Sequence, residues 1–244
     1  MSPDGKVALV TGGAVRVGRA IVEELALAGW VVAFTYRSSA GPAQELAGRL
    51  QARGQRALAL EADLDESGAR TAVARRVEAT LGGLDALVNS AAVFRRTPLA
   101  DLNQEGLAAT LRTNLEAPLF LTLACRQMLR LRRGSVVNIV DIYGSLPLRD
   151  YLAYSVSKAA LIAATRSLAV ELAPEVRVNA VAPGIAIFPA DYDAATRDRL
   201  LARTLLRREG GAAEIAGAVR YLLEGTQTMT GQVLTIDGGR TIAL

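Results

Sequence analysis

The chain has 244 residues, a mass of 25.7 kDa, 51% hydrophobic and 21% charged residues, and a net charge of +4. This composition supplies a large buried core and excludes disordered and fibrous chains. No run of about 18 uncharged apolar residues occurs, so we expect no contact with a membrane through a spanning helix. Of the 28 basic residues only Lys6 and Lys158 are lysines. Because the arginines are scattered through helical stretches, we expect solvated helix faces and no nucleic-acid partner, although an anionic small molecule fits the charge equally well.

The sequence contains no histidine and one cysteine, Cys125. Without histidine, imidazole metal sites and schemes that need a histidine base are excluded, and we expect no metal. Cys125 lies in an apolar stretch and is expected to be a core residue. The N-terminal stretch reaches a strand-like run within a few residues, so we expect no signal peptide and a cytoplasmic location.

In chain order, continuous apolar runs predict strands at residues 7–10, 31–36, 57–60, 84–89, 135–140, 177–181 and 233–236. Between them, helical spacing predicts helices at about 16–29, 41–53, 67–81, 101–131, 151–173 and 212–224. This alternation predicts a doubly wound (Rossmann) α/β fold, with helices on both faces of a parallel sheet. We expect residues 1–244 to form one domain, with a substrate lid at about 185–208 where the periodicity is weak.

A glycine-rich turn, TGGAVRVG at residues 11–18, joins the first strand to the first helix. Gly12 and Gly18 would let the backbone approach a ligand, and the helix N-terminus directs free amides at an anion such as a dinucleotide pyrophosphate. Alone, such a turn could be only a tight connection, but its place in the fold favours a cofactor site.

The second strand ends in TYRSSAG, and no acidic residue occurs from Val31 to Gln44. NAD-binding folds usually place an acidic residue here to hold the ribose hydroxyls. Arg37 and Ser38 suit a phosphate instead, so we expect NADPH, unless Arg37 is simply one of many surface arginines. After the third strand, Asp63 and Leu64 are placed to meet the adenine edge.

Tyr154 and Lys158 stand four residues apart in a predicted helix and therefore share one face. A nearby cation favours the phenolate, so we expect Lys158 to lower the pKa of Tyr154 and to make a proton donor for a group that receives hydride. The simpler interpretation is a surface helix pair.

Together these motifs resemble the short-chain dehydrogenase/reductase superfamily over essentially the whole chain. The further matching segments are VNSAA at 88–92, Asn114 in RTNLEAP, RVNAVAPG at 177–184 and IDGG at 236–239. The resemblance implies a seven-stranded sheet, hydride transfer from a nicotinamide, Tyr154 as proton donor, Lys158 on the nicotinamide ribose and Asn114 in a proton relay. The expected cofactor-binding residues are Gly12, Arg16, Val17, Gly18, Arg37, Ser38, Asp63, Leu64, Asn89, Ser90, Ala91, Tyr154, Lys158, Pro183 and Gly184.

Three departures from the superfamily pattern point to a substrate class. Asp141 replaces the serine that normally stands 13 residues before the tyrosine, and an ionised carboxylate accepts hydrogen bonds from N–H groups rather than polarising a carbonyl. Phe94 could stack on a flat heterocycle. Arg16 could meet both a cofactor phosphate and a heterocycle carbonyl.

These features resemble the pteridine reductase branch and the related bacterial dihydromonapterin reductases. The expected activity is NADPH-dependent reduction of dihydropterin or dihydrofolate, with Asp141, Tyr154, Lys158 and Asn114 as catalytic residues and Arg16, Phe94, Asp141 and Tyr154 at the substrate. A ketoreductase acting on an acyl, sugar or steroid carbonyl and a non-catalytic NADP-binding protein are the alternatives. Ala92 and Ala186 replace polar residues of that branch. The resemblance also implies a homotetramer or dimer.

Overall fold

A seven-stranded parallel sheet runs through the computed structural model, which describes residues 5–188 and 192–243. Its strand order is β3-β2-β1-β4-β5-β6-β7, and every pair of neighbours is parallel. The predicted fold class and all seven predicted strands are confirmed, with ends that differ by at most two residues. The strands are β1 (Val7–Val10), β2 (Val31–Tyr36), β3 (Ala57–Glu61), β4 (Ala86–Asn89), β5 (Ser135–Ile139), β6 (Arg177–Pro183) and β7 (Val233–Ile236).

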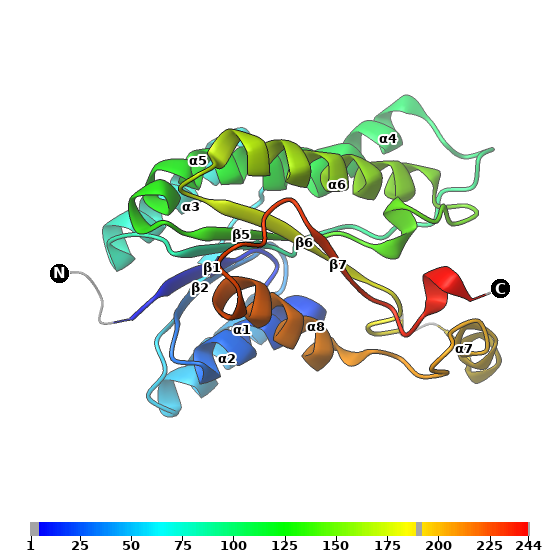
Figure 1. Cartoon of the computed structure of the whole chain (residues 1–244), viewed down its shortest axis with the longest axis horizontal. Helices are drawn as coiled ribbons and strands as arrows, with labels where there is room; N and C mark the ends of the chain where they lie inside the picture. Colours follow the sequence, from blue (N-terminus) through cyan, green and yellow to red (C-terminus); the bar gives the residue numbers. More distant parts are fainter. Residues whose placement is uncertain (1–4, 189–191, 244) are drawn as a thin grey trace.

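Helices cover both faces of the sheet (Figure 1). One layer contains α1 (Arg16–Leu27), α2 (Ala40–Ala52) and α8 (Gly211–Arg220), and the other contains α3 (Ser67–Leu81), α4 (Gln104–Leu111), α5 (Ala117–Arg132) and α6 (Leu152–Leu172).

Strand β1 shows why the apolar runs are continuous rather than alternating. Val7 and Leu9 pack in the core cluster under α3 and α5, whereas Ala8 and Val10 pack in the cluster under α1 and α8. Since both faces of the strand are buried, every position is apolar. Cys125 is buried in the first of these clusters, as predicted.

The predicted helix at 101–131 is divided in the structure. Asn103 caps α4 by accepting a hydrogen bond from the Gly106 amide at 2.8 Å, so the helix begins at Gln104. A π-helical turn, η1 (Arg112–Glu116), then separates α4 from α5. Pro118 lies in the first turn of α5 and has no N–H to donate back, which favours a widened turn at this point.

A short helix, α7 (Ala194–Leu201), lies in the segment at 184–210, for which the sequence predicted no helix. None of its residues is buried, so its sequence carries no apolar stripe by which helical spacing could be detected. Residues 189–191 of the expected lid lie outside the described residues.

The sheet reverses its direction of winding between β1 and β4, because the chain builds β1, β2 and β3 outward and then returns to the other side of β1. In open parallel sheets, ligands bind at the carboxyl ends of the strands at this switch point. The segments after β1, β2, β4, β5 and β6 all meet there.

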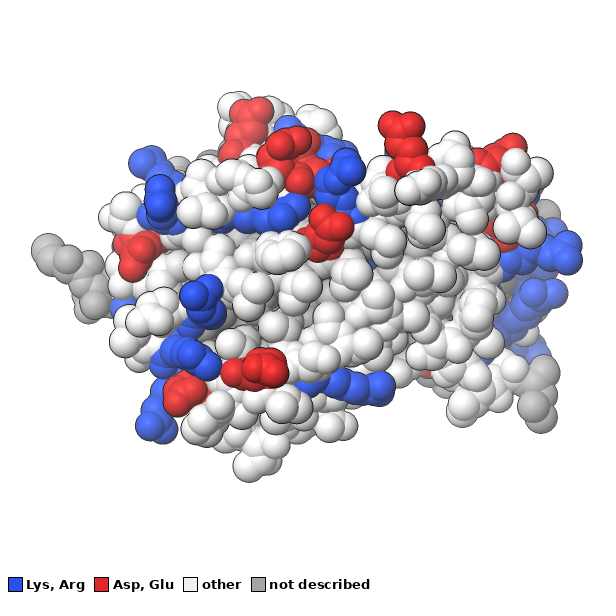
Figure 2. Space-filling model, turned by 90° about the horizontal axis from the view of Figure 1, so that it is seen from above, with Lys and Arg blue, Asp and Glu red and all other residues white. Residues whose placement is uncertain are grey.

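On the face seen in Figure 2, charged side chains of both signs lie mostly toward the margin, basic ones gather at the right-hand edge, and most of the middle is uncharged. The middle of this face therefore carries no continuous basic patch of the kind that binds a nucleic-acid backbone. Within residues 5–188 and 192–243, no helix is both long and apolar enough to cross a membrane.

Candidate active site

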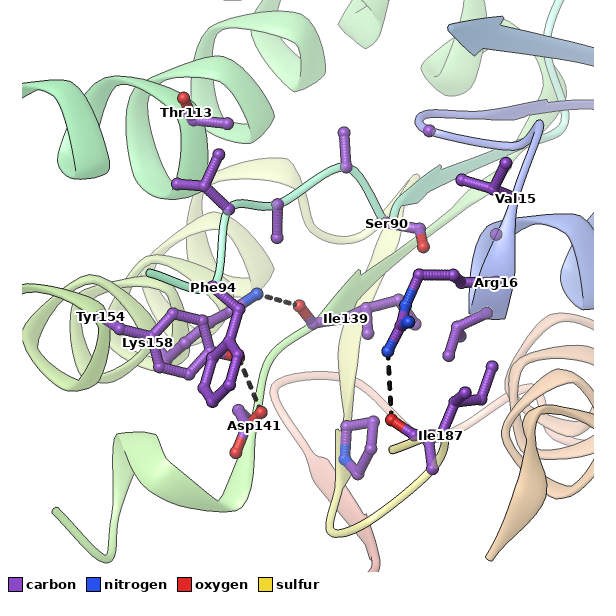
Figure 3. A pocket seen from close by; sticks show the side chains of 18 of the residues that line it. Val15, Arg16, Ser90, Phe94, Thr113, Ile139, Asp141, Tyr154, Lys158 and Ile187 are labelled. Carbon is purple, nitrogen blue, oxygen red and sulfur yellow. Dashed lines mark hydrogen bonds between the residues drawn. The ribbon is translucent and has the colours of Figure 1, made fainter. Parts of the chain in front are cut away.

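A cavity of about 540 Å³ lies at the switch point (Figure 3). It is lined by the turn after β1, the ends of β2 and β5, the loop after β4, the start of α6 and the segment after β6. The structure brings most of the predicted site residues to this cavity. They are Gly12, Arg16, Val17, Gly18, Arg37, Ser38, Leu64, Ser90, Ala91, Phe94, Asp141, Tyr154, Lys158, Pro183 and Gly184.

The glycine turn allows close backbone approach. Gly12 has φ +64°, and a Cβ there would lie 3.0 Å from the Ala91 Cα. At Gly18 a Cβ would lie 2.1 Å from the Gly12 carbonyl oxygen, so only glycine fits. The first residues of α1 line the cavity and have no side-chain cap at Val15. These features fit a dinucleotide pyrophosphate.

Arg16 joins this turn to the segment after β6. It adopts a left-handed backbone conformation, φ +53°, and its Nη2 donates to the Ile187 carbonyl oxygen at 3.1 Å (Figure 3). Its guanidinium is therefore placed between the predicted phosphate region and the expected lid.

Arg37 lies at the cavity with Ser38, but its guanidinium also has acidic neighbours. Its Nη1 is 3.3 Å from Asp65 Oδ2 and 3.6 Å from Asp63 Oδ1. Leu64 lines the cavity, whereas the Asp63 side chain is turned toward Arg37 and is not part of the lining. The predicted adenine contact of Asp63 therefore remains a prediction.

Tyr154, Asp141 and Lys158 lie together at the other end of the cavity (Figure 3). The Tyr154 hydroxyl donates to Asp141 Oδ2 at 2.7 Å, and the Tyr143 amide donates to Asp141 Oδ1 at 2.8 Å. Lys158 Nζ donates to the Ile139 carbonyl oxygen at 2.8 Å and lies 5.8 Å from the centre of the Tyr154 ring. Tyr154 and Lys158 thus share one helix face, as the spacing predicted.

Burial controls the acidity of this cluster. Burial raises the pKa of Tyr154 well above its usual value, and the charge and hydrogen bond of Asp141 raise it further. Burial lowers the pKa of Lys158 to about 8, an effect that Asp141 opposes. Burial also raises the pKa of Asp141, although the hydrogen bonds from Tyr154 and Tyr143 oppose this shift.

The expectation that Lys158 lowers the pKa of Tyr154 is therefore wrong for this structure. The lysine ammonium is directed at the Ile139 carbonyl, while the carboxylate of Asp141 contacts the phenol directly. A neighbouring carboxylate and desolvation both favour the neutral phenol. At neutral pH, Tyr154 is a hydroxyl donor to Asp141.

Phe94 lies in an aromatic cluster with two tyrosines. Its ring stacks on Tyr151, with centroids 4.5 Å apart and an interplanar angle of 17°, and meets Tyr154 edge to face at 4.7 Å. Phe94 as a residue is 45% exposed and lines the cavity. Its ring is thus available to a planar ligand, while Tyr151 supports one of its faces.

Asn114 and Asn89 lie behind the cavity wall. Asn114 is held in η1 and bonds both the amide and the carbonyl of Val93, at 2.9 and 3.0 Å, and its Nδ2 also donates to Ser157 Oγ at 3.0 Å. Asn89 donates to Asn138 Oδ1 at 2.8 Å. Both asparagines fix the loop and strands that line the cavity rather than facing into it.

Sequence reasoning missed several lining residues, among them Tyr143, Tyr151 and Thr113. The i, i+3 spacing of Tyr151 and Tyr154 is a signal that could have identified Tyr151 as a neighbour of the predicted proton donor. No sequence pattern identified Thr113, because it lies in the π-helical turn η1, which regular helical spacing does not predict.

Comparison with known proteins agrees with this architecture. The family model described as enoyl-(acyl carrier protein) reductase matches residues 13–241. The chain belongs to the short-chain dehydrogenase/reductase superfamily. It is therefore an oxidoreductase of that superfamily, as the sequence motifs implied.

Individual members of the superfamily show the range of relatives. The chain is 38% identical to a protein of Streptomyces violaceoruber named as ketoacyl reductase 2 of the granaticin polyketide synthase, covering 98% of this chain and 97% of the relative. It is 32% identical to pteridine reductase 1 of Leishmania tarentolae, covering 99% and 98%. A short-chain dehydrogenase of Burkholderia cenocepacia, solved with NADP, is 37% identical with a TM-score of 0.91, covering 97% and 98%. The NADP in that relative agrees with the cofactor predicted from Arg37 and Ser38.

Proposed function

We propose that this short-chain reductase uses NADPH to reduce a pteridine, either dihydropterin or dihydrofolate. The observation that carries the proposal is the 2.7 Å hydrogen bond from Tyr154 to Asp141. A carboxylate at this position accepts hydrogen bonds and can receive the amino and ring N–H groups of a nitrogen heterocycle. It offers no hydroxyl donor for the oxygen of a ketone.

Each residue of the site has a role that follows from its position in the cavity. Asp141, fixed by the Tyr143 amide, orients the Tyr154 hydroxyl, and Tyr154 or a water that it orders protonates the reduced nitrogen. Lys158 supplies positive charge under the phenol ring. The exposed ring of Phe94 stacks on the planar substrate. Asn114 supports the proton relay by holding the Val93 backbone and Ser157.

The cofactor site fits NADPH on three observations. The glycine turn has no space for a Cβ at Gly18, no side chain caps the first turn of α1, and Arg16 and Arg37 place positive charge at the same end of the cavity. NADPH, when bound, supplies the hydride. Lys158 Nζ makes one hydrogen bond to protein among the described contacts, which leaves further N–H donors for the nicotinamide ribose.

The test is oxidation of NADPH by the purified protein with dihydrobiopterin or dihydrofolate, repeated with NADH. The proposal expects turnover of at least one of these substrates with NADPH and much weaker turnover with NADH. No turnover of either pteridine under conditions where NADPH binds would refute it.

A second candidate is reduction of a 3-oxoacyl or related carbonyl, and the 38% identity to the granaticin ketoacyl reductase favours it. In that case the Tyr154 hydroxyl, which donates to Asp141 in the structure, would turn to the carbonyl oxygen, just as it would turn to the reduced nitrogen of a pteridine. Turnover of 3-oxoacyl thioesters without turnover of pteridines would support this candidate.

We also propose that the protein forms a homotetramer. Large apolar side chains stay exposed on two adjacent helices, with Phe120 and Leu131 on α5 and Val170 on α6. Multi-angle light scattering should give a mass near four times 25.7 kDa, and a monomer mass would contradict the assembly.

A further inference from the structure

Arg37 is shared between the predicted phosphate site and the turn after β3. Its Nη1 faces the carboxylates of Asp65 and Asp63, at 3.3 and 3.6 Å. No described hydrogen bond uses its Nη2 or Nε, which leaves these groups for a ligand. One edge of the guanidinium therefore faces protein carboxylates, and the other edge can bind a ligand.

Both carboxylates accept a hydrogen bond, Asp63 from the Asp65 amide at 3.1 Å, but Asp65 is the more buried and the closer to Arg37. The Thr113 hydroxyl donates to Asp65 Oδ2 at 3.0 Å, and Arg70 Nη2 donates to the Asp65 carbonyl oxygen at 2.9 Å. The Asp65 side chain is 23% exposed, against 46% for Asp63. Because exposed ion pairs form and break readily, Asp65 is the carboxylate that stays beside Arg37.

A cofactor phosphate bound at Arg37 would lie near both the guanidinium and the Asp65 carboxylate. One guanidinium carries a single positive charge, and Asp65 already offsets it on one side. A phosphate monoester carries about −1.5 to −2 charge at neutral pH and is repelled by a fixed carboxylate nearby. NADH, which lacks the ribose phosphate, has no such group at this end.

We propose that Asp65 is a specificity-determining residue that limits the preference for NADPH by holding and partly neutralising Arg37. The inference rests on the proposed assignment of Arg37 to the cofactor phosphate. Thr113 takes part through its hydrogen bond to Asp65, so the π-turn η1 contributes to cofactor selection.

The experiment measures the dissociation constants of NADPH and NADH by fluorescence for the wild type and Asp65→Asn. Asparagine keeps an oxygen for the Thr113 hydroxyl and removes only the charge. Glu66→Gln is the matched control, because it deletes the same charge one residue away and Glu66 makes no side-chain cap bond. Arg37→Ala tests the underlying assignment independently.

We expect Asp65→Asn to tighten NADPH binding about fivefold, from the screened repulsion of one charge and a phosphate several ångströms apart, with NADH binding changed much less. This gain in NADPH affinity should shrink at about 1 M salt, where the Debye length is about 3 Å. Glu66→Gln should tighten NADPH binding less than Asp65→Asn does. Unchanged or weaker NADPH binding in Asp65→Asn, while Arg37→Ala still lowers the preference for NADPH, would overturn the inference alone. An unchanged preference in Arg37→Ala would overturn the phosphate assignment and the inference with it.

Discussion

Replacement of Asp141 by asparagine tests the residue that most distinguishes this site. The new side chain would keep the oxygen that accepts the Tyr143 amide, so the turn after β5 should stay intact. The negative charge that receives the Tyr154 hydroxyl at 2.7 Å is lost. A hydrogen bond to a charged partner contributes about 1.5–3 kcal/mol. If that energy orients Tyr154 and the substrate in the transition state, kcat/KM for dihydropterin falls about 10- to 150-fold.

The assay compares kcat/KM for dihydrobiopterin with the dissociation constant of NADPH, which should change by less than about twofold because Asp141 lies at the substrate end. A melting curve provides the control for folding. Removing a partly buried carboxylate removes a desolvation cost, so we expect no fall in the melting temperature. Unchanged kcat/KM, or equal losses in catalysis and NADPH binding, would refute the role assigned to Asp141.

Further predictions concern the lysine, the aromatic cluster and the glycine turn. Because burial lowers the pKa of Lys158 to about 8, its charge is lost as the pH rises through about 8 and kcat/KM should fall there. Lys158→Arg should move this fall to higher pH, and a wild-type profile flat to about pH 10 would contradict the assignment. Phe94→Ala should raise the KM for dihydropterin about 2- to 12-fold, since an aromatic pair contributes about 0.5–1.5 kcal/mol, and an equal rise in the KM for NADPH would argue against stacking. Gly18→Ala should lower stability by about 1–3 kcal/mol and weaken NADPH binding, because the new Cβ meets the Gly12 carbonyl oxygen. Gly48→Ala, in open space on α2, is its control and should be neutral or stabilising in a melting curve.

The strands could be predicted because a parallel sheet covered on both faces needs continuous apolar runs. The turn at residues 11–18 could be predicted because its glycines are needed where a Cβ would collide with backbone. By contrast, α7 buries no residue and has no apolar stripe, so its sequence carries no such signal.

The chemistry of the site could be predicted only in part. The pairing of Tyr154 with Asp141 follows from their residue types and from the superfamily pattern. The pKa of Tyr154 does not, because it depends on burial and on where Lys158 directs its ammonium. The partners of Arg37 were missed for a similar reason, since Asp65 follows another strand and only the register of β2 and β3 brings the two residues together.

The proposed preference for a pteridine over a ketone depends on Asp141. The most direct measurement is the ratio of kcat/KM for dihydrobiopterin to kcat/KM for a 3-oxoacyl thioester, with NADPH, for the wild type and Asp141→Ser. We predict a ratio well above one for the wild type, and a fall in this ratio when serine supplies a hydroxyl donor for a carbonyl. A wild-type ratio below one that Asp141→Ser leaves unchanged would contradict the account.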